Sequence, residues 1–195
     1  MKLPPLILAS ASPRRADLLR QLKLDFEVIP SDAKEVFDDH LSPQELCQLN
    51  AHRKARTVAK KLPDALVMGA DTLVFLDHQI FGKPASAVEA KKMLLQLQGR
   101  THQVVTGVSL IQLRAHRERI FAVSTDVLFR SLTPGQVDEY LSKINPLDKA
   151  GAYAIQESGE LIVSEISGSF SNVVGLPIEK VEDELATWEE PESRI

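Results

Sequence analysis

The sequence has few features that point to a disulfide-stapled, membrane or nucleic-acid-binding protein. It contains one cysteine in 195 residues, Cys47, so an intramolecular disulfide is excluded. The helical pattern around Cys47 favours a packed thiol over a nucleophile. No apolar run approaches the roughly 20 residues that span a bilayer. The formal net charge of −4 argues against the basic face that a nucleic-acid polymer needs.

Export signals are missing as well. The apolar run at residues 6–9 is too short for the hydrophobic region of a signal peptide, and a single cysteine suits a reducing compartment. We therefore expect a cytoplasmic protein without membrane or nucleic-acid partners, in a compartment where small phosphorylated metabolites are available.

Familiar catalytic and metal-binding motifs are also absent. The five histidines show no paired ligand spacing and no cysteine cluster accompanies them, which argues against a structural zinc site. The sequence has neither a P-loop nor a nucleophile elbow. An enzyme acting on a polyphosphate would then most simply use water, a carboxylate base and a divalent cation that neutralises the phosphates.

What the sequence does contain is an ordinary globular composition, with 44% hydrophobic and 26% charged residues. Its length fits a single domain with a sizeable core. We expect one domain over residues 1–188 and a disordered acidic tail over residues 189–195.

Helical and strand-like patterns alternate through the first half of the chain, and two long strand-like runs follow. The helical patterns cover residues 13–22, 43–61, 87–97, 134–143 and 178–185. The strand-like runs cover residues 6–9, 26–29, 66–69, 72–76, 79–81, 102–113, 120–130 and 161–165. Asp77 and His78 are typical of a hairpin turn, and residues 114–117 would join the two long runs as an antiparallel pair. The sequence therefore predicts an α/β fold with a mixed sheet and two lobes.

The most informative segment is Ser10 to Arg15, where a strand-like run leads into a helical pattern. Ser12 suits the N-cap and Pro13 suits the first helical position. Two arginines follow, although the helix dipole favours acids there by roughly 0.3 to 1 kcal/mol each. Three other helix starts in the chain carry the glutamate or glutamine of a capping box, and this one does not.

Free backbone N–H groups, hydroxyls and two guanidinium groups at one helix end make a site suited to a polyphosphate. These residues alone fit a second interpretation equally well. In it, the segment is a surface helix whose Arg14 and Arg15 pair with acids elsewhere in the chain.

Two acidic residues are candidates for chemistry. Asp71 interrupts a hydrophobic strand pattern at its far end, where an unpaired carboxylate is costly to bury, so it needs a cation, a donor or a role. A structural turn aspartate is the alternative. Glu35 follows a strand, and carboxylates in such places can hold Mg²⁺ together with substrate phosphates, although loops contain many acids without that role.

Several loops could approach a ligand, and each also fits an ordinary turn. Gly82 would let the backbone come close to a ligand while Lys83 supplies a point charge. Residues 148–156 contain small residues, where a backbone could close over a flat ligand. Residues 169–177 could form a second anion site or only a long helix cap.

In this order and over nearly the whole chain, these segments resemble the Maf family of nucleoside triphosphate pyrophosphatases. The resemblance runs from about Leu6 to Leu185 and rests on residues 10–15, 35, 54, 69–72, 82–84, 106–108, 148–153 and 171–177. It implies a Maf/ITPase-like elongated α/β fold, with a mixed twisted sheet and helices in two lobes flanking a nucleotide cleft. It also implies cleavage between the α and β phosphates, a divalent cation such as Mg²⁺ or Mn²⁺, and a homodimer.

By position, the resemblance also implies roles for single residues. Asp71 would be the catalytic base, and Glu35 would help it to hold the metal. The phosphate-binding set would be Ser10, Arg14, Arg15, Lys54, Lys83 and Lys149. Lys34 stands where the family often has an acid, which leaves open how many carboxylates bind the metal.

Arg14, Thr72 and Gln156 match the branch of the family that acts on dTTP and UTP. Glutamine chemistry agrees in part, because its amide can accept from N3–H of uracil or thymine and donate to O4. The flipped amide would suit cytosine, so CTP or a modified pyrimidine nucleotide stays open. A nucleotide-sensing regulator of cell division, without turnover, is the alternative. Asp71 and Glu35 favour the enzyme, because a sensor needs no base.

Overall fold

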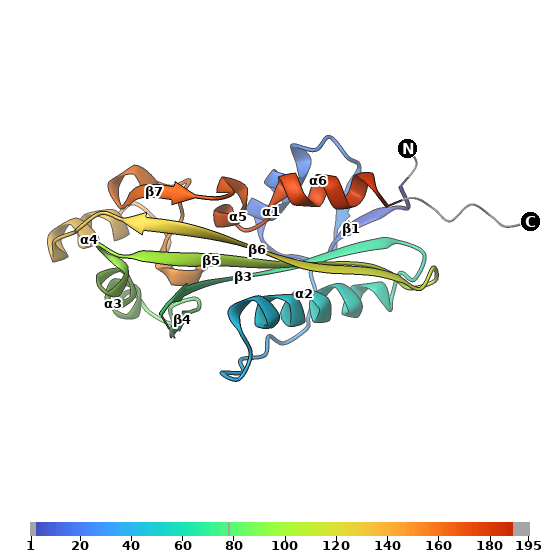
Figure 1. The fold of residues 1–195 in the computed structure, drawn as a ribbon, viewed down its shortest axis with the longest axis horizontal. Coiled ribbons are helices and arrows are strands. Elements are labelled where there is room, and N and C mark those ends of the chain that lie inside the picture. The colour runs from blue at the N-terminus through green and yellow to red at the C-terminus, as the bar shows by residue number, and fades with distance from the viewer. Residues whose placement is uncertain (1–2, 78, 189–195) are drawn as a thin grey trace, which may run out of the picture.

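The computed structural model describes residues 3–77 and 79–188 as an elongated α/β structure (Figure 1). Within these residues one mixed sheet has the strand order β2-β1-β3-β5-β6-β7, and β4 pairs with β3. The strands are β1 (Leu6–Leu8), β2 (Phe26–Val28), β3 (Leu66–Leu76), β4 (Gln79–Phe81), β5 (Thr101–Gln112), β6 (Arg117–Phe129) and β7 (Val163–Ser167). β1 runs parallel to β2 and β3, whereas the other pairs are antiparallel. The expected α/β fold with a mixed sheet is confirmed.

Helices cover both faces of this sheet. They are α1 (Pro13–Arg20), α2 (Pro43–Ala59), α3 (Ala87–Leu97), α4 (Pro134–Leu141), α5 (Phe170–Val174) and α6 (Ile178–Ala186), with short 3-10 turns η1 (Ala150–Ala152) and η2 (Gly159–Leu161). In Figure 1, α2 lies against one face of the long strands, α1 and α6 lie against the other, and α3 and α4 lie at one end. None of the helices in the described ranges has the length and apolar character needed to cross a membrane.

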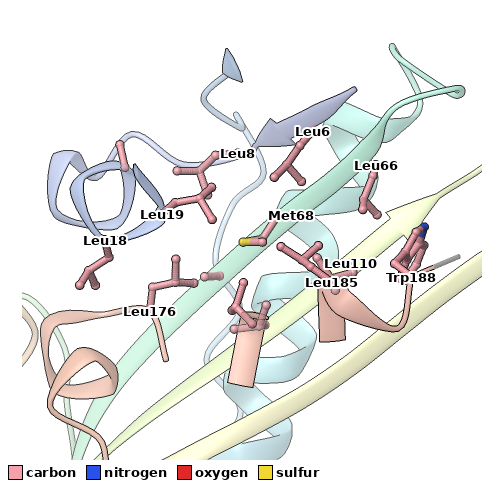
Figure 2. Close-up of a cluster of buried hydrophobic side chains, with 14 of the residues drawn as sticks. Leu6, Leu8, Leu18, Leu19, Leu66, Met68, Leu110, Leu176, Leu185 and Trp188 are labelled. Carbon is pink, nitrogen blue, oxygen red and sulfur yellow. The ribbon is translucent and has the colours of Figure 1, made fainter. Parts of the chain in front are cut away.

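Buried hydrophobic residues in the described ranges form four clusters, and the two larger ones lie towards opposite ends of the long strands. In the first, Leu66, Met68 and Leu110 of the sheet meet Leu18 and Leu19 of α1, together with Leu176, Leu185 and Trp188 (Figure 2). The second core lies at the other end of β3, β5 and β6, where Val74, Phe81, Leu94, Phe129 and Tyr140 are buried. We call the regions around these two clusters the two lobes, and the two smaller clusters pack α2 against the sheet.

Helix α2 packs unusually close to the sheet because two glycines face it. A Cβ atom on Gly69 of β3 would lie 2.3 Å from the Ala51 carbonyl oxygen. A Cβ atom on Gly107 of β5 would lie 2.3 Å from the Cys47 carbonyl carbon. Any side chain at either position would push the helix away, so the glycines allow short α2 side chains to reach the middle of β3.

The structure corrects the prediction of two separate strands, over residues 66–69 and 72–76, with Asp71 at the break between them. β5 pairs with β3 residue by residue from Val67 to Phe75, and this pairing carries β3 through Asp71 without a break. Asp71 therefore lies in the middle of a strand and not at its end. Tertiary pairing has overridden the local signal of a polar residue beside glycine and alanine.

Other boundaries also differ. β6 begins at Arg117, three positions before the expected residue 120, because its pairing with β5 extends into the turn. β7 covers residues 163–167 and not 161–165, since residues 159–161 form η2. The short helix α5 was not predicted. The β3–β4 hairpin is confirmed, with Asp77 in its turn. His78 and the tail at residues 189–195 lie outside the described residues.

Candidate active site

A gap in the pairing of β3 places the candidate site. β1 pairs with Leu66 to Met68 and β4 pairs with Val74 to Leu76, so within the described chain residues 69–73 have no strand partner on that edge. A cavity of about 340 Å³ opens beside this stretch. Ligands of α/β proteins usually bind beside the carboxyl ends of parallel strands, and here β1 ends while its parallel neighbour β3 continues.

All of the candidate residues except Asp71 line this cavity, although they come from segments far apart in the sequence. They are Ser10, Arg14, Arg15, Glu35, Lys54, Thr72, Lys83, Lys149 and Gln156. Tyr153, Val173 and Val174 add apolar surface. The cavity therefore combines cations, a carboxylate, hydroxyls and an amide with apolar walls.

The first turn of α1 forms one wall of the cavity. Ser12 occupies the N-cap position and Pro13 the first helical position, as predicted, but the Ser12 side chain makes no capping bond to any described residue. By contrast, Ser42, Ser86 and Thr133 each cap their helix by accepting from a backbone N–H. The start of α1 thus lacks both the capping bond and the glutamate or glutamine that those three helices carry in their first turn.

The two arginines of this turn have different partners. Arg15 donates to the carbonyl oxygens of Gly175 at 2.8 Å and Ala70 at 2.9 Å, and to Thr72 Oγ1 at 2.9 Å. Ser10 Oγ lies 3.4 Å from Arg15 Nη1. The Arg15 guanidinium therefore joins α1 to β3, at the unpaired edge, and to the turn before α6.

Arg14 instead reaches across the cavity to the opposite lobe. Its guanidinium contacts the Asp148 carboxylate at 2.9 Å and the Asp148 carbonyl oxygen at 3.2 Å. Partial burial would raise the pKa of Asp148, but hydrogen bonds from Arg14 and Lys149 outweigh it and lower that pKa. The sequence left open that Arg14 or Arg15 pairs with an acid elsewhere in the chain. Arg14 does so, and its partner Asp148 also lines the cavity.

Lys149 is nearly enclosed, with 4% of its side chain exposed. Its Nζ contacts the Asn145 carbonyl oxygen at 2.8 Å, Asp148 Oδ1 at 2.9 Å and Glu157 Oε1 at 3.2 Å. Three partners from its own loop hold this ammonium, so Lys149 shapes the loop as well as lining the cavity.

Four side chains on the α2 side form what we call the carboxylate cluster: Glu35, Asn50, Lys54 and Asp71. Lys54 Nζ lies 2.7 Å from Glu35 Oε1 and 2.6 Å from Asp71 Oδ1. Asn50 Nδ2 lies 3.3 Å from Asp71 Oδ2. Asn50 and Lys54 are four residues apart on α2, so they lie on one face of that helix.

The two carboxylates of this cluster are shifted in opposite directions. Burial raises the pKa of Asp71, and the charge of Lys54 only partly offsets it. Burial also acts to raise the pKa of Glu35, but the hydrogen bond and charge of Lys54, together with the charge of Lys83, lower it. Asp71 is thus the more basic carboxylate of the pair.

Asp71 lies behind the cavity wall. It is 4% exposed and is not among the described residues that line the cavity. Adjacent residues of a strand point to opposite faces, so Asp71 faces α2 and Thr72 faces α1. Access from the cavity to Asp71 passes Lys54, which touches both the cavity and the Asp71 carboxylate.

Three candidates for substrate contacts differ in how free they are. Thr72 Oγ1 accepts from Arg15 and lies 3.0 Å from Thr106 Oγ1, so its hydroxyl is engaged. Among the described residues, Lys83 has no ion-pair partner and the Gln156 amide makes no hydrogen bond. Lys83 and Gln156 are therefore polar groups of the cavity that a ligand could bind without displacing a protein partner.

Residues 169–177 form a helix cap and not a second anion site. Ser169 Oγ accepts from Asn172 N–H, and Ser171 Oγ accepts from Ile178 N–H at 3.0 Å. Glu179 accepts from both hydroxyls, at 3.0 Å from Ser169 and 2.7 Å from Ser171. A protein carboxylate thus occupies the place where an anion could have bound.

An acidic group stands apart from the predicted metal ligands. Ligand atoms of Asp38, Asp39 and His40 lie within 4.8 Å of one another on a largely exposed loop. The predicted ligands Glu35 and Asp71 instead share the Lys54 ammonium.

Asn50 completes the carboxylate cluster and was not among the predicted site residues. Its position four residues before Lys54 was the available signal, because that spacing places both side chains on the same helix face. The partnership of Arg14 with Asp148 left no such signal, since 134 positions separate the two residues.

Comparison with known proteins gives a consistent result over nearly the whole chain. Residues 5–188 match the family described as Maf-like protein. A dTTP/UTP pyrophosphatase of Moorella thermoacetica is 49% identical over 183 residues, which cover 94% of each chain. Proteins of the same name from Syntrophus aciditrophicus and Akkermansia muciniphila are 47% and 45% identical, covering 92% of this chain and 88% and 94% of theirs. Because both the family match and these relatives span most of the chain, the protein belongs to the Maf-like family.

Proposed function

We propose that this protein is a nucleoside triphosphate pyrophosphatase that hydrolyses dTTP and UTP to the monophosphate and pyrophosphate. One observation carries the proposal: a single cavity gathers Lys83, Arg14, the uncapped start of α1 and Gln156 beside the carboxylate cluster. Relatives named dTTP/UTP pyrophosphatase, at 45–49% identity over most of the chain, support the substrate class.

The triphosphate would bind against α1 and Lys83. Backbone N–H groups at a helix start and guanidinium groups are favourable partners for phosphate oxygens. Lys83 has no ion-pair partner in the described chain, so it can bind a phosphate at no cost in broken contacts. Arg14 would exchange the Asp148 carboxylate for a phosphate. Arg15, Ser10 and Lys149 would support this site through the contacts described above.

The carboxylate cluster would supply the base for hydrolysis. A base that works near neutral pH benefits from a raised pKa, and burial raises that of Asp71. In the proposed reaction a water molecule adds to phosphorus, the α–β phosphoanhydride bond breaks, and Asp71 takes the proton of the water. Glu35 keeps its charge at the edge of the cavity because Lys54 and Lys83 lower its pKa.

The same carboxylates fit a divalent cation. Oxygen donors of Glu35 and Asp71 are those that Mg²⁺ or Mn²⁺ prefers, and phosphate oxygens of the substrate would complete the shell. The Lys54 ammonium contacts both carboxylates and places one positive charge between them. A divalent cation would place two positive charges at the same carboxylates. The metal, when bound, would neutralise the phosphates.

Gln156 would read the base. Its exposed amide can donate to O4 and accept from N3–H of uracil or thymine, and Thr72 and Arg14 would shape the site with it. CTP or a modified pyrimidine nucleotide fits the flipped amide. We further propose that residues 1–188 form a single functional unit and that the protein is a cytoplasmic homodimer.

The test is a comparison of kcat/KM for dTTP, UTP, CTP, GTP and ATP with Mg²⁺ and with Mn²⁺. We expect dTTP and UTP to be preferred over both purine nucleotides. Tight binding of dTTP without measurable turnover would instead favour the nucleotide-sensing regulator.

A further inference from the structure

Asn50 has its whole amide engaged by the two segments that carry the carboxylates of the cluster. It is 2% exposed on α2. Its Oδ1 accepts from Val36 N–H at 2.8 Å, and its Nδ2 donates to the Val36 carbonyl oxygen at 3.1 Å. The same Nδ2 donates to Asp71 Oδ2 at 3.3 Å. One side chain thus bridges the residue after Glu35 and the middle of β3.

This bridge matters because the segment that carries Glu35 has no regular secondary structure to hold it in place. Residues 29–38 form neither helix nor strand. Asn50 bonds both backbone groups of Val36 in the way a neighbouring strand would, and it does so from a helix that the glycines of β3 and β5 hold close to the sheet. Glu35 is therefore fixed from one side by Lys54 and through its neighbour by Asn50.

The two oxygens of Asp71 are divided between two residues of α2. Lys54 contacts Oδ1 and Asn50 contacts Oδ2. An amide suits this place because it supplies two donors and one acceptor without charge. Aspartate would remove both donors and add a third carboxylate, and leucine of similar size would remove every bond.

We propose that Asn50 is a positioning residue for the reaction, which holds Glu35 and Asp71 at a fixed separation and fixes the orientation of the Asp71 carboxylate. This inference rests on the proposed function of the same site. Asn50 itself touches neither the cavity nor a substrate, because it lies behind Lys54 and Asp71 and does not line the cavity in the described chain.

The test uses the full chain with Asn50→Leu. We expect kcat for dTTP to fall by about 10- to 100-fold, as is usual when a supporting hydrogen bond of a reactive group is removed. KM for dTTP should change by less than about threefold, because Arg14 and Lys83 keep their places and the lost interaction does not bind substrate. Without nucleotide or metal, hydrogen exchange at the Val36 amide should accelerate by about tenfold or more, because Asn50 is its acceptor.

The matched control is Gln44→Leu. This change also removes an amide of α2, whose Nε2 lies 3.1 Å from Ser124 Oγ, but it does not touch the carboxylate cluster. It should leave kcat and Val36 exchange as in the wild type.

A wild-type kcat, or wild-type exchange at Val36, in Asn50→Leu would overturn the proposal. If that variant does not fold, Asn50→Asp has the same shape and lacks both donors, so kcat should fall in it as well. Undiminished kcat in Asn50→Asp would equally overturn the positioning role. If the wild type released no pyrophosphate from any nucleotide, the proposed function would fail, while Val36 exchange would still decide whether Asn50 fixes this segment.

Discussion

Two polar clusters lie along the long strands of the sheet, and they differ in charge. The carboxylate cluster, at the middle of β3, holds two acids and one ammonium in direct contact. The second, which we call the histidine cluster, comprises His102 of β5, Phe129 of β6 and Tyr153. His102 Nε2 lies 2.8 Å from the Tyr153 hydroxyl, and its ring packs edge-on against both aromatic rings.

The histidine cluster is neutral where the carboxylate cluster is charged. Burial lowers the pKa of His102 to about 4, and within the described chain its Nδ1 has no hydrogen-bond partner. Burial also raises the pKa of Tyr153. Since Tyr153 lines the cavity, this cluster adds an apolar wall, whereas the carboxylate cluster keeps charges that a ligand can exchange. The long strands β3, β5 and β6 thus support both a charged cluster and an apolar wall.

The largest effect should come from Asp71→Asn, which removes the base but keeps its shape. Base catalysis typically contributes about 10² to 10⁴ in rate, so kcat for dTTP should fall by that factor. Lys54 keeps its contact with Glu35, and the variant should therefore stay folded. Steady-state kinetics and a thermal melt measure both quantities; undiminished kcat would remove Asp71 from the mechanism.

The histidine cluster should instead control stability against pH. The pKa of His102 is about 4 in the folded protein and ordinarily 6.5, so between these values only the unfolded chain takes up the proton. The stabilisation that comes from a neutral His102 is fully present above pH 6.5 and is lost as pH falls towards 4. The loss in unfolding free energy is about 3 kcal/mol, because one pKa unit corresponds to about 1.36 kcal/mol.

Urea unfolding at several pH values in this window measures the effect. His102→Gln should flatten the decline in unfolding free energy, and His40→Gln, at an exposed histidine, should not. An unchanged decline in His102→Gln would mean that other groups cause it.

A shift of base preference should follow from Gln156→Glu at the cavity wall. The variant keeps an acceptor but loses the donor to O4 of uracil and thymine, so relative kcat/KM should move towards CTP or GTP. Once a bound base covers the side chain of residue 156, a mismatched polar pair costs about 1 to 3 kcal/mol, which corresponds to roughly 5- to 150-fold. Equal losses for all nucleotides would show that Gln156 shapes the cavity without reading the base.

The smallest effect should come from the cations that bind phosphate. Lys83→Ala should raise KM for dTTP by about tenfold, the equivalent of one charge-assisted bond of roughly 1.4 kcal/mol. Arg14→Ala should cost less, because Arg14 must first leave Asp148. The control is Lys91→Ala, which removes a surface ion pair with Asp138. An unchanged KM in Lys83→Ala would exclude this phosphate site.

Local chemistry explains which parts of this molecule the sequence predicts. The start of α1 could be predicted because the N-cap, the proline and the missing acid are all properties of neighbouring residues. The position of Asp71 within β3 could not be predicted from the sequence, since pairing with β5 decides it. The bonds from Asn50 to Val36, and from Arg14 to Asp148, join segments that meet only in the folded chain.

The most direct test of the proposed function is product analysis of dTTP turnover by ³¹P NMR, with wild type and Asp71→Asn side by side in the presence of Mg²⁺. We expect the wild type to form dTMP and pyrophosphate in equal amounts and the variant to form almost none in the same time. Release of dTDP and orthophosphate by the wild type, or equal rates in the two proteins, would contradict it.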